Sequence, residues 1–137
     1  MKFLVDTNVV SEQVQKYPSE KVLRWLEEND QAIRLSVITI AEVKRGISRQ
    51  PENQKKKDLQ KWFDEVLRSF SERILPIDKE VALTWGEMYS AAQRHGFNPP
   101  GFDSLLAATA LKHNLVVVTR NEDDFRGTGV KTINPWE

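Results

Sequence analysis

A chain of 137 residues, 39% of them apolar, has the length of one ordinary domain and enough apolar side chains for one sizeable core. Its 20 basic and 20 acidic residues balance, which excludes attraction of nucleic acid or an anionic membrane by net charge. The absence of cysteine excludes disulfides and thiolate metal sites, and two histidines are too few for a histidine-rich zinc site. The N-terminal apolar run is too short for a signal peptide, and no stretch reaches the ~20 apolar residues that span a bilayer. We therefore expect a soluble cytoplasmic protein.

Short β-type runs alternate along the chain with amphipathic helical patterns. In chain order, the patterns predict strand Lys2–Val5, helix Tyr17–Asn29, strand Ala32–Val37, helices Ile40–Ser48 and Glu52–Glu72, strand Arg73–Ile77, helices Asp78–His95 and Asp103–His113, and strands Leu115–Thr119 and Val130–Asn134. Such alternation is typical of a parallel sheet with helices on both faces. We predict an α/β fold: a single domain over residues 1–137 with a central, mostly parallel five-stranded sheet.

Four acidic residues border apolar runs in distant parts of the chain: Asp6, Glu42, Asp103 and Asp124. In an open α/β sheet, the carboxyl ends of parallel strands and the adjoining helix starts converge on one crevice. At an effective dielectric near 20 and ~4 Å separation, each like-charged pair would cost roughly 4 kcal/mol. Such a cluster needs a cation or retained protons, and a divalent metal among carboxylates indicates phosphodiester hydrolysis.

Each of these acids has a simpler interpretation when it is taken alone. Asp6 is a good N-cap for a following helix, and Thr39 with Glu42 forms the Thr-x-x-Glu pattern of a capping box. Asp103 falls in the first turn of a helix, where the helix dipole favours a negative charge. Asp124 lies in a segment with the composition of a turn. The joint pattern, in which all four point into one predicted crevice, favours a shared site.

With these motifs in this order, the chain resembles the PIN-domain ribonucleases of the VapC toxin type over essentially its whole length. The motifs that carry the resemblance are Val5–Glu12, Leu35–Val43, Phe102–Ala110, Val118–Asn121 with Asp124 and Phe125, and the tail Asn134–Trp136. Each motif is weak by itself, whereas their order and spacing together are specific.

The resemblance implies a PIN-like nuclease domain and a Mg²⁺-dependent endoribonuclease, with Mn²⁺ as the other cation. It also implies cleavage that leaves a 5′-phosphate and a 3′-hydroxyl, a cognate antitoxin that inhibits the enzyme, and a homodimer. By position, the catalytic acids are Asp6, Glu42 and Asp103, with Asp6 and Asp103 as direct metal ligands. Family members carry the fourth carboxylate either where Asn121 stands or three residues later. We assign it to Asp124, with Asn121 as a hydrogen-bonding helper.

A neutral chain must grip RNA with local groups, which we expect at the rim of the crevice. The expected substrate contacts are Arg45, Arg49, Thr119, Arg120 and Asn121. Arg45 and Arg49 are predicted to share the outer helix face with Glu42, whereas Lys55–Lys57 has the pattern of a solvated face.

Other protein classes that gather aspartates at strand ends fit less well. A receiver module needs an early acidic pair and a late lysine, but Asp6 stands alone and Arg120 follows Thr119. A haloacid-dehalogenase-like phosphatase needs Asp-x-Asp, where this chain has Asp6-Thr7-Asn8. The alternative that stays open is a catalytically weak PIN fold that only binds RNA or protein.

Overall fold

The computed structural model describes residues 2–137 and contains one five-stranded sheet. Its strands are β1 (Phe3–Val5), β2 (Ile33–Ser36), β3 (Ile74–Leu75), β4 (Val116–Val118) and β5 (Thr132–Ile133). The order across the sheet is β3-β2-β1-β4-β5, and every neighbouring pair is parallel. The predicted fold class and strand locations are confirmed, although each strand is shorter than its apolar run.

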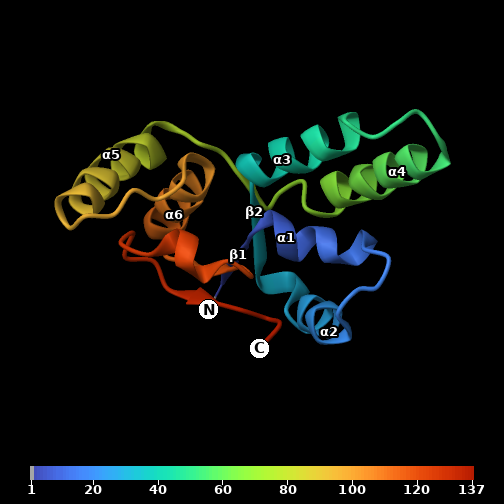
Figure 1. The fold of residues 1–137 in the computed structure, drawn as a ribbon, viewed down its shortest axis with the longest axis horizontal. Helices are drawn as coiled ribbons and strands as arrows, with labels where there is room; N and C mark the ends of the chain where they lie inside the picture. Colours follow the sequence, from blue (N-terminus) through green and yellow to red (C-terminus); the bar gives the residue numbers. More distant parts are fainter. Residues whose placement is uncertain (1) are drawn as a thin grey trace.

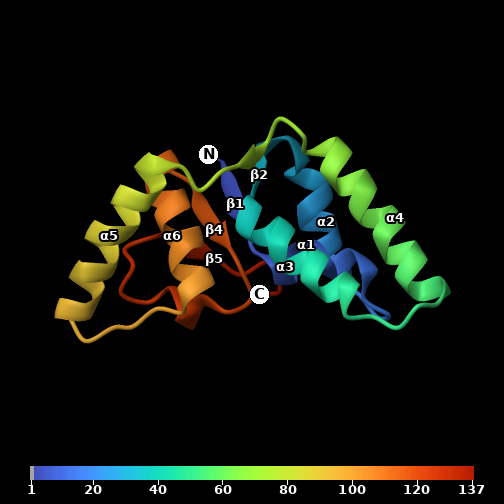
Figure 2. The same ribbon diagram turned by 90° about the horizontal axis from the view of Figure 1, so that it is seen from above.

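Six α-helices and three short 3₁₀ helices surround this sheet. They are α1 (Thr7–Val10), α2 (Glu20–Glu28), α3 (Val37–Ser48), α4 (Gln54–Ser69), α5 (Lys79–Arg94) and α6 (Gly101–His113), with η1 (Ser11–Val14), η2 (Asp30–Ala32) and η3 (Glu122–Phe125). Helices α5 and α6 lie on one side of the sheet and α1 to α4 on the other (Figures 1 and 2). No helix of residues 2–137 is long and apolar enough to cross a bilayer.

The two faces of the sheet each bury a separate apolar core. Successive strand residues point to opposite faces, so Leu4 belongs to the core under α5 and α6, whereas Val5 belongs to the core under α1, α2 and α4. Val117 and Val118 divide in the same way on β4. Because both faces are covered, the central strands are almost continuously apolar, as is usual in parallel sheets.

The passage from β2 into α3 differs from the prediction. The helix begins at Val37, directly after the strand, although the sequence suggested a strand to Val37 and a helix from Ile40. Ser36 is the N-cap, since its side chain accepts a hydrogen bond of 3.0 Å from the backbone N–H of Ile38. The simpler interpretation of Thr39 and Glu42 as a capping box is therefore wrong. The Thr39 hydroxyl is buried inside the first turns without a hydrogen-bond partner among the described residues.

The loop before α6 positions the start of that helix. Pro99 and Pro100 end the loop, and α6 begins at Gly101, two residues before Asp103. The Tyr89 hydroxyl on α5 donates a hydrogen bond of 3.1 Å to the Pro99 carbonyl. The helix is largely buried from Ser104 to Ala110, which confirms the predicted interior helix.

Candidate active site

The four predicted carboxylates come from four different elements at the carboxyl end of the sheet. Asp6 follows β1, Glu42 lies on α3, Asp103 is in the first turn of α6, and Asp124 lies on η3. The negative charges of Glu42 and Asp124 act on both Asp6 and Asp103, and the charge of Asp6 also acts on Asp103. The structure thus brings together the four side chains that the sequence singled out.

Asp6 is the most constrained member of this acidic cluster (Asp6, Glu42, Asp103 and Asp124). Only 6% of its surface is exposed. Its Oδ1 accepts a hydrogen bond of 2.7 Å from the Thr7 backbone N–H, and its Oδ2 accepts one of 2.8 Å from the Thr119 hydroxyl and one of 3.4 Å from the Asn8 amide. Burial raises the pKa of Asp6 above its ordinary value, although the bonds from Thr119 and Thr7 oppose this rise. Asp6 both caps α1 and belongs to the cluster.

Glu42 is oriented by a residue that the sequence reasoning did not single out. The Thr7 hydroxyl donates a hydrogen bond of 2.6 Å to Oε1 of Glu42, across 35 positions of sequence. Thr7 thus contacts two carboxylates, with its backbone N–H on Asp6 and its hydroxyl on Glu42. A signal was present in the sequence, since Thr7 is the only hydroxyl residue directly beside Asp6.

The surroundings of Asp103 raise its pKa well above the ordinary value. Burial, followed by the negative charges of Asp6, Asp124 and Glu42, raises the pKa of Asp103 to about 7. Interaction with the Asp124 side chain adds to this rise in the pKa of Asp103. A carboxyl group with this pKa is protonated in a substantial fraction of molecules at neutral pH when nothing else compensates the charge of the cluster.

The segment after β4 positions Asp6 through the side chain of Thr119. Thr119 is fully buried, and its hydroxyl donates to Asp6 while accepting a hydrogen bond of 3.1 Å from the Asn121 backbone N–H. The predicted substrate contact Thr119 therefore lies beneath Asp6 and positions it. Asn121 is exposed, and its carbonyl accepts a bond of 3.1 Å from the Asp124 N–H.

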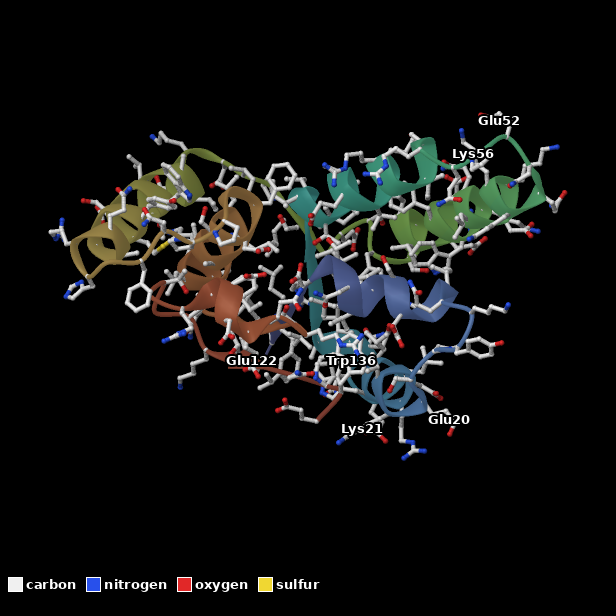
Figure 3. The ribbon with its side chains drawn as sticks, in the orientation of Figure 1. Glu20, Lys21, Glu52, Lys56, Glu122 and Trp136 are labelled. Atoms are coloured by element: carbon white, nitrogen blue, oxygen red, sulfur yellow. The ribbon has the colours of Figure 1, made fainter. Side chains whose placement is uncertain are left out.

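The three arginines predicted to contact the substrate are all exposed. Arg45 and Arg49 are exposed on α3, the helix that carries Glu42. The Arg120 guanidinium lies 4.7 Å from the ring centre of Trp136, and its backbone N–H donates to the Asn8 side chain at 3.3 Å. Trp136 lies on the C-terminal tail beside α2 in Figure 3. Arg120 is thus held at the edge of the site by the tail.

None of the ion pairs among residues 2–137 neutralises the acidic cluster. They are Lys56–Glu52, Arg68–Glu65 and Arg73–Asp30. Glu52 and Lys56 lie at the outer end of the α3–α4 hairpin in Figure 3, so the lysine run at 55–57 is on a solvated face as expected.

The donor set of the cluster is all oxygen, which suits a hard divalent cation such as Mg²⁺. Asp6 is buried and the other three carboxylates are partly buried, and none of the four forms an ion pair with a cationic side chain in the part of the chain that the structure describes. Among residues 2–137, no three Asp, Glu, His or Cys side chains are grouped so that they could hold a metal ion by themselves. Mg²⁺ usually binds through one or two carboxylates and keeps several waters, so the residues present fit such an ion.

Comparison with known proteins gives one consistent result. Residues 3–131 match the model of the PIN domain. The chain is 37% identical to toxin FitB of Neisseria gonorrhoeae over 97% of both proteins, and 32% identical to the VapC ribonuclease Y4jK of Sinorhizobium fredii over 98% of this chain and 97% of that protein. Its fold superposes on the crystal structure of FitAcB from Neisseria gonorrhoeae with a TM-score of 0.93, at 36% identity, covering 98% of this chain and 99% of that one.

Proposed function

Because this chain belongs to the PIN-domain family, we propose that it is a VapC-type endoribonuclease, the toxin of a toxin–antitoxin pair, which hydrolyses RNA phosphodiester bonds with Mg²⁺ or Mn²⁺. The observation that carries the proposal is the convergence of Asp6, Glu42, Asp103 and Asp124 from distant elements, with no ion-pair partner for them among residues 2–137. Such an arrangement costs free energy in a protein that only needs a stable fold. A bound divalent cation would offset the repulsion between these carboxylates and would attract an RNA phosphate.

In this proposal Asp6 and Asp103 bind the cation directly, and Glu42 and Asp124 act directly or through waters. A divalent cation supplies positive charge for the phosphate oxygens and lowers the pKa of a nearby water. The chain contributes the orientation of the carboxylates. Thr119 holds Asp6, and Thr7 holds Glu42, so neither acid has to be ordered when RNA binds.

RNA is held by local groups in this proposal, because the net charge of the chain is zero. Arg45 and Arg49 supply exposed guanidinium groups on α3, the helix that carries Glu42, Arg120 supplies one just after β4, and Asn121 offers an amide. Sequence-specific proteins read RNA mostly in single-stranded loops, whose bases are free to contact side chains. We propose that the substrate is an RNA cut within a single-stranded loop.

The partner that follows from a VapC-type toxin is a cognate antitoxin that blocks the site until it is degraded. Two relatives point the same way, since one is a toxin and the other a VapC ribonuclease. We also propose that the enzyme is a homodimer. Co-expression with the adjacent open reading frame, followed by co-purification and mass determination, tests both statements.

Cleavage assays separate a nuclease from a PIN fold that only binds RNA. Purified wild type should cut a structured RNA with single-stranded loops in Mg²⁺ or Mn²⁺ and stop when EDTA is added. Asp103→Asn should bind the same RNA without cutting it. Calorimetric titration with Mn²⁺ should give a binding isotherm for wild type and a weaker one for Asp103→Asn. Binding of RNA without metal-dependent cleavage by wild type would favour the scaffold.

A further inference from the structure

A pocket of about 350 Å³ opens directly beside the acidic cluster. Its walls are the loop residues 97–100 on one side and Asp123, Asp124 and Arg126 on the other. Asp124 belongs to both the pocket and the cluster, so the two are contiguous. We propose that this pocket, hereafter the 97–126 pocket, is the subsite for the nucleotide next to the scissile phosphate of a single-stranded RNA. The inference rests on the proposed nuclease function, and it names the pocket that binds one nucleotide of the RNA substrate.

The walls of the 97–126 pocket are fixed before any ligand binds. On the loop side, the Phe97 backbone N–H donates to the Ala92 carbonyl at 2.9 Å, and the Tyr89 hydroxyl donates to the Pro99 carbonyl at 3.1 Å. The Phe97 ring packs directly on the backbone of Gly127, where an added Cβ would lie 2.4 Å from its Cγ atom. Gly127 has φ of +82°, so both its conformation and its neighbour call for glycine. A pocket with fixed walls avoids part of the ordering cost of binding.

The η3 side of the pocket is fixed in a similar way. The Arg126 backbone N–H donates to the Asp123 carbonyl at 3.2 Å, and the Thr128 hydroxyl donates to the Phe125 carbonyl at 2.6 Å. Phe125 is buried in the core under α5 and α6. The side chains that face the pocket therefore project from an anchored backbone.

Arg126 is the one basic residue among those that line the pocket. Its guanidinium lies 6.0 Å from the Phe97 ring centre, and it takes part in none of the ion pairs found among residues 2–137. Its side-chain donors are thus available although two carboxylates line the same pocket. Guanidinium groups bind phosphate through paired hydrogen bonds, and here one would offset the repulsion between RNA and the acidic cluster.

The remaining lining groups suit a base. Proline and phenylalanine carbons offer apolar surface for the face of the ring, since Phe97 is half-buried and Pro100 is exposed. Asn98 and Asp123 are exposed and carry the amide and carboxylate that hydrogen-bond base edges. The volume of the pocket falls at the lower end of the range for small-molecule sites, which suits one nucleotide.

The first test removes the positive charge of the Arg126 side chain. Arg126→Ala should raise KM for a short single-stranded RNA about ten-fold, the usual consequence of losing one charge-assisted hydrogen bond. It should also reduce the slope of log KM against log salt by about 0.7, as expected for one phosphate contact on a single strand. The control is Arg24→Ala, which removes the same charge from exposed α2, away from the pocket, and should leave KM and the slope unchanged. An unchanged KM and slope in Arg126→Ala would overturn the proposal.

The second test reads the base. Wild type and Asn98→Ala are incubated with a pool of random single-stranded RNA and Mg²⁺, and the product ends are sequenced. We expect Asn98→Ala to lose base preference at one position beside the cut and to retain it elsewhere. Preference that is identical in both enzymes would remove Asn98 and the pocket from recognition. If wild type cuts no RNA in any of these assays, the proposed function itself fails, which is a different outcome from a normal KM in Arg126→Ala.

Discussion

The hydroxyl of Thr119 donates a hydrogen bond of 2.8 Å to Oδ2 of Asp6 across 113 positions of sequence. The two residues follow β4 and β1, which are neighbours in the sheet with Val118 opposite Val5. The Asp6 backbone N–H also donates to the Val118 carbonyl at 2.9 Å. The direction of the Asp6 carboxylate is therefore set by the register of strands β1 and β4.

Thr119→Val is predicted to impair cleavage because it removes the donor to Asp6 while keeping a side chain of similar volume. We expect kcat to fall at least ten-fold and the free energy of unfolding to fall by about 1–2 kcal/mol, because the carboxylate stays buried with one partner fewer. Thr119→Ser keeps the donor and should retain most of the activity. Single-turnover cleavage and urea unfolding of the two variants measure these effects. Full activity in Thr119→Val would show that Asp6 does not need this bond.

Asp103→Asn is predicted to stabilise the metal-free protein at alkaline pH. The pKa of Asp103 is raised from 3.8 to about 7, so between these values the folded protein binds more protons than the unfolded chain. Wild type without metal should therefore lose stability as the pH rises through this range and recover it as the pH falls.

Replacing the acid by an amide removes that dependence, and it should raise the free energy of unfolding at pH 8 by about 1 kcal/mol after allowance for solvent screening. Urea unfolding with EDTA at pH 5 and pH 8 compares the two proteins. A variant that is less stable than wild type at pH 8 would mean that Asp103 chiefly supports the start of α6.

Two neighbouring hydroxyl residues are predicted to have opposite effects on stability. Ser36→Ala removes the N-cap of α3 and should lower the free energy of unfolding by about 1 kcal/mol. Thr39→Val replaces a buried hydroxyl without a partner and should raise it by about 1 kcal/mol. Thermal unfolding of both variants gives the comparison. A loss of stability in Thr39→Val equal to that in Ser36→Ala would restore the capping box that the sequence suggested.

Gly127→Ala is predicted to damage both stability and the 97–126 pocket. The new methyl group would overlap the Phe97 ring, and the residue would keep a positive φ that costs roughly 1–2 kcal/mol in itself. We expect a loss of at least 2 kcal/mol of stability, together with a higher KM for RNA. Gly46→Ala is the control, because Gly46 lies inside α3 with nothing within 4 Å of an added Cβ. It should raise stability by about 0.5–1 kcal/mol.

The positions of the sheet and of the four acids could be predicted because both depend on short-range patterns. Runs such as Val116–Val118 can only be buried, and parallel strands direct the residues after them to one edge. The approximate bounds of α4, α5 and α6 followed from apolar periodicity and from nearby helix breakers such as Pro99 and Pro100.

The parts that the sequence did not predict depend on competition between similar residues or on contacts across the fold. Ser36 and Thr39 are both good caps, and the structure takes the first because β2 ends there. The bond from Thr7 to Glu42 joins α1 to α3, and Thr119 meets Asp6 only once β4 has paired with β1. The close packing of Phe97 on Gly127 likewise leaves no local signature in either segment.

The place of β1 in the middle of the sheet has a consequence for synthesis of the protein. Residues 3–5 are translated well before one of their two neighbours in the sheet, β4, which lies at residues 116–118. A nascent chain cannot complete its centre until that late segment has emerged from the exit tunnel. A chain that stops before β4 therefore lacks both one neighbour of β1 and Thr119, whose hydroxyl holds the Asp6 carboxylate.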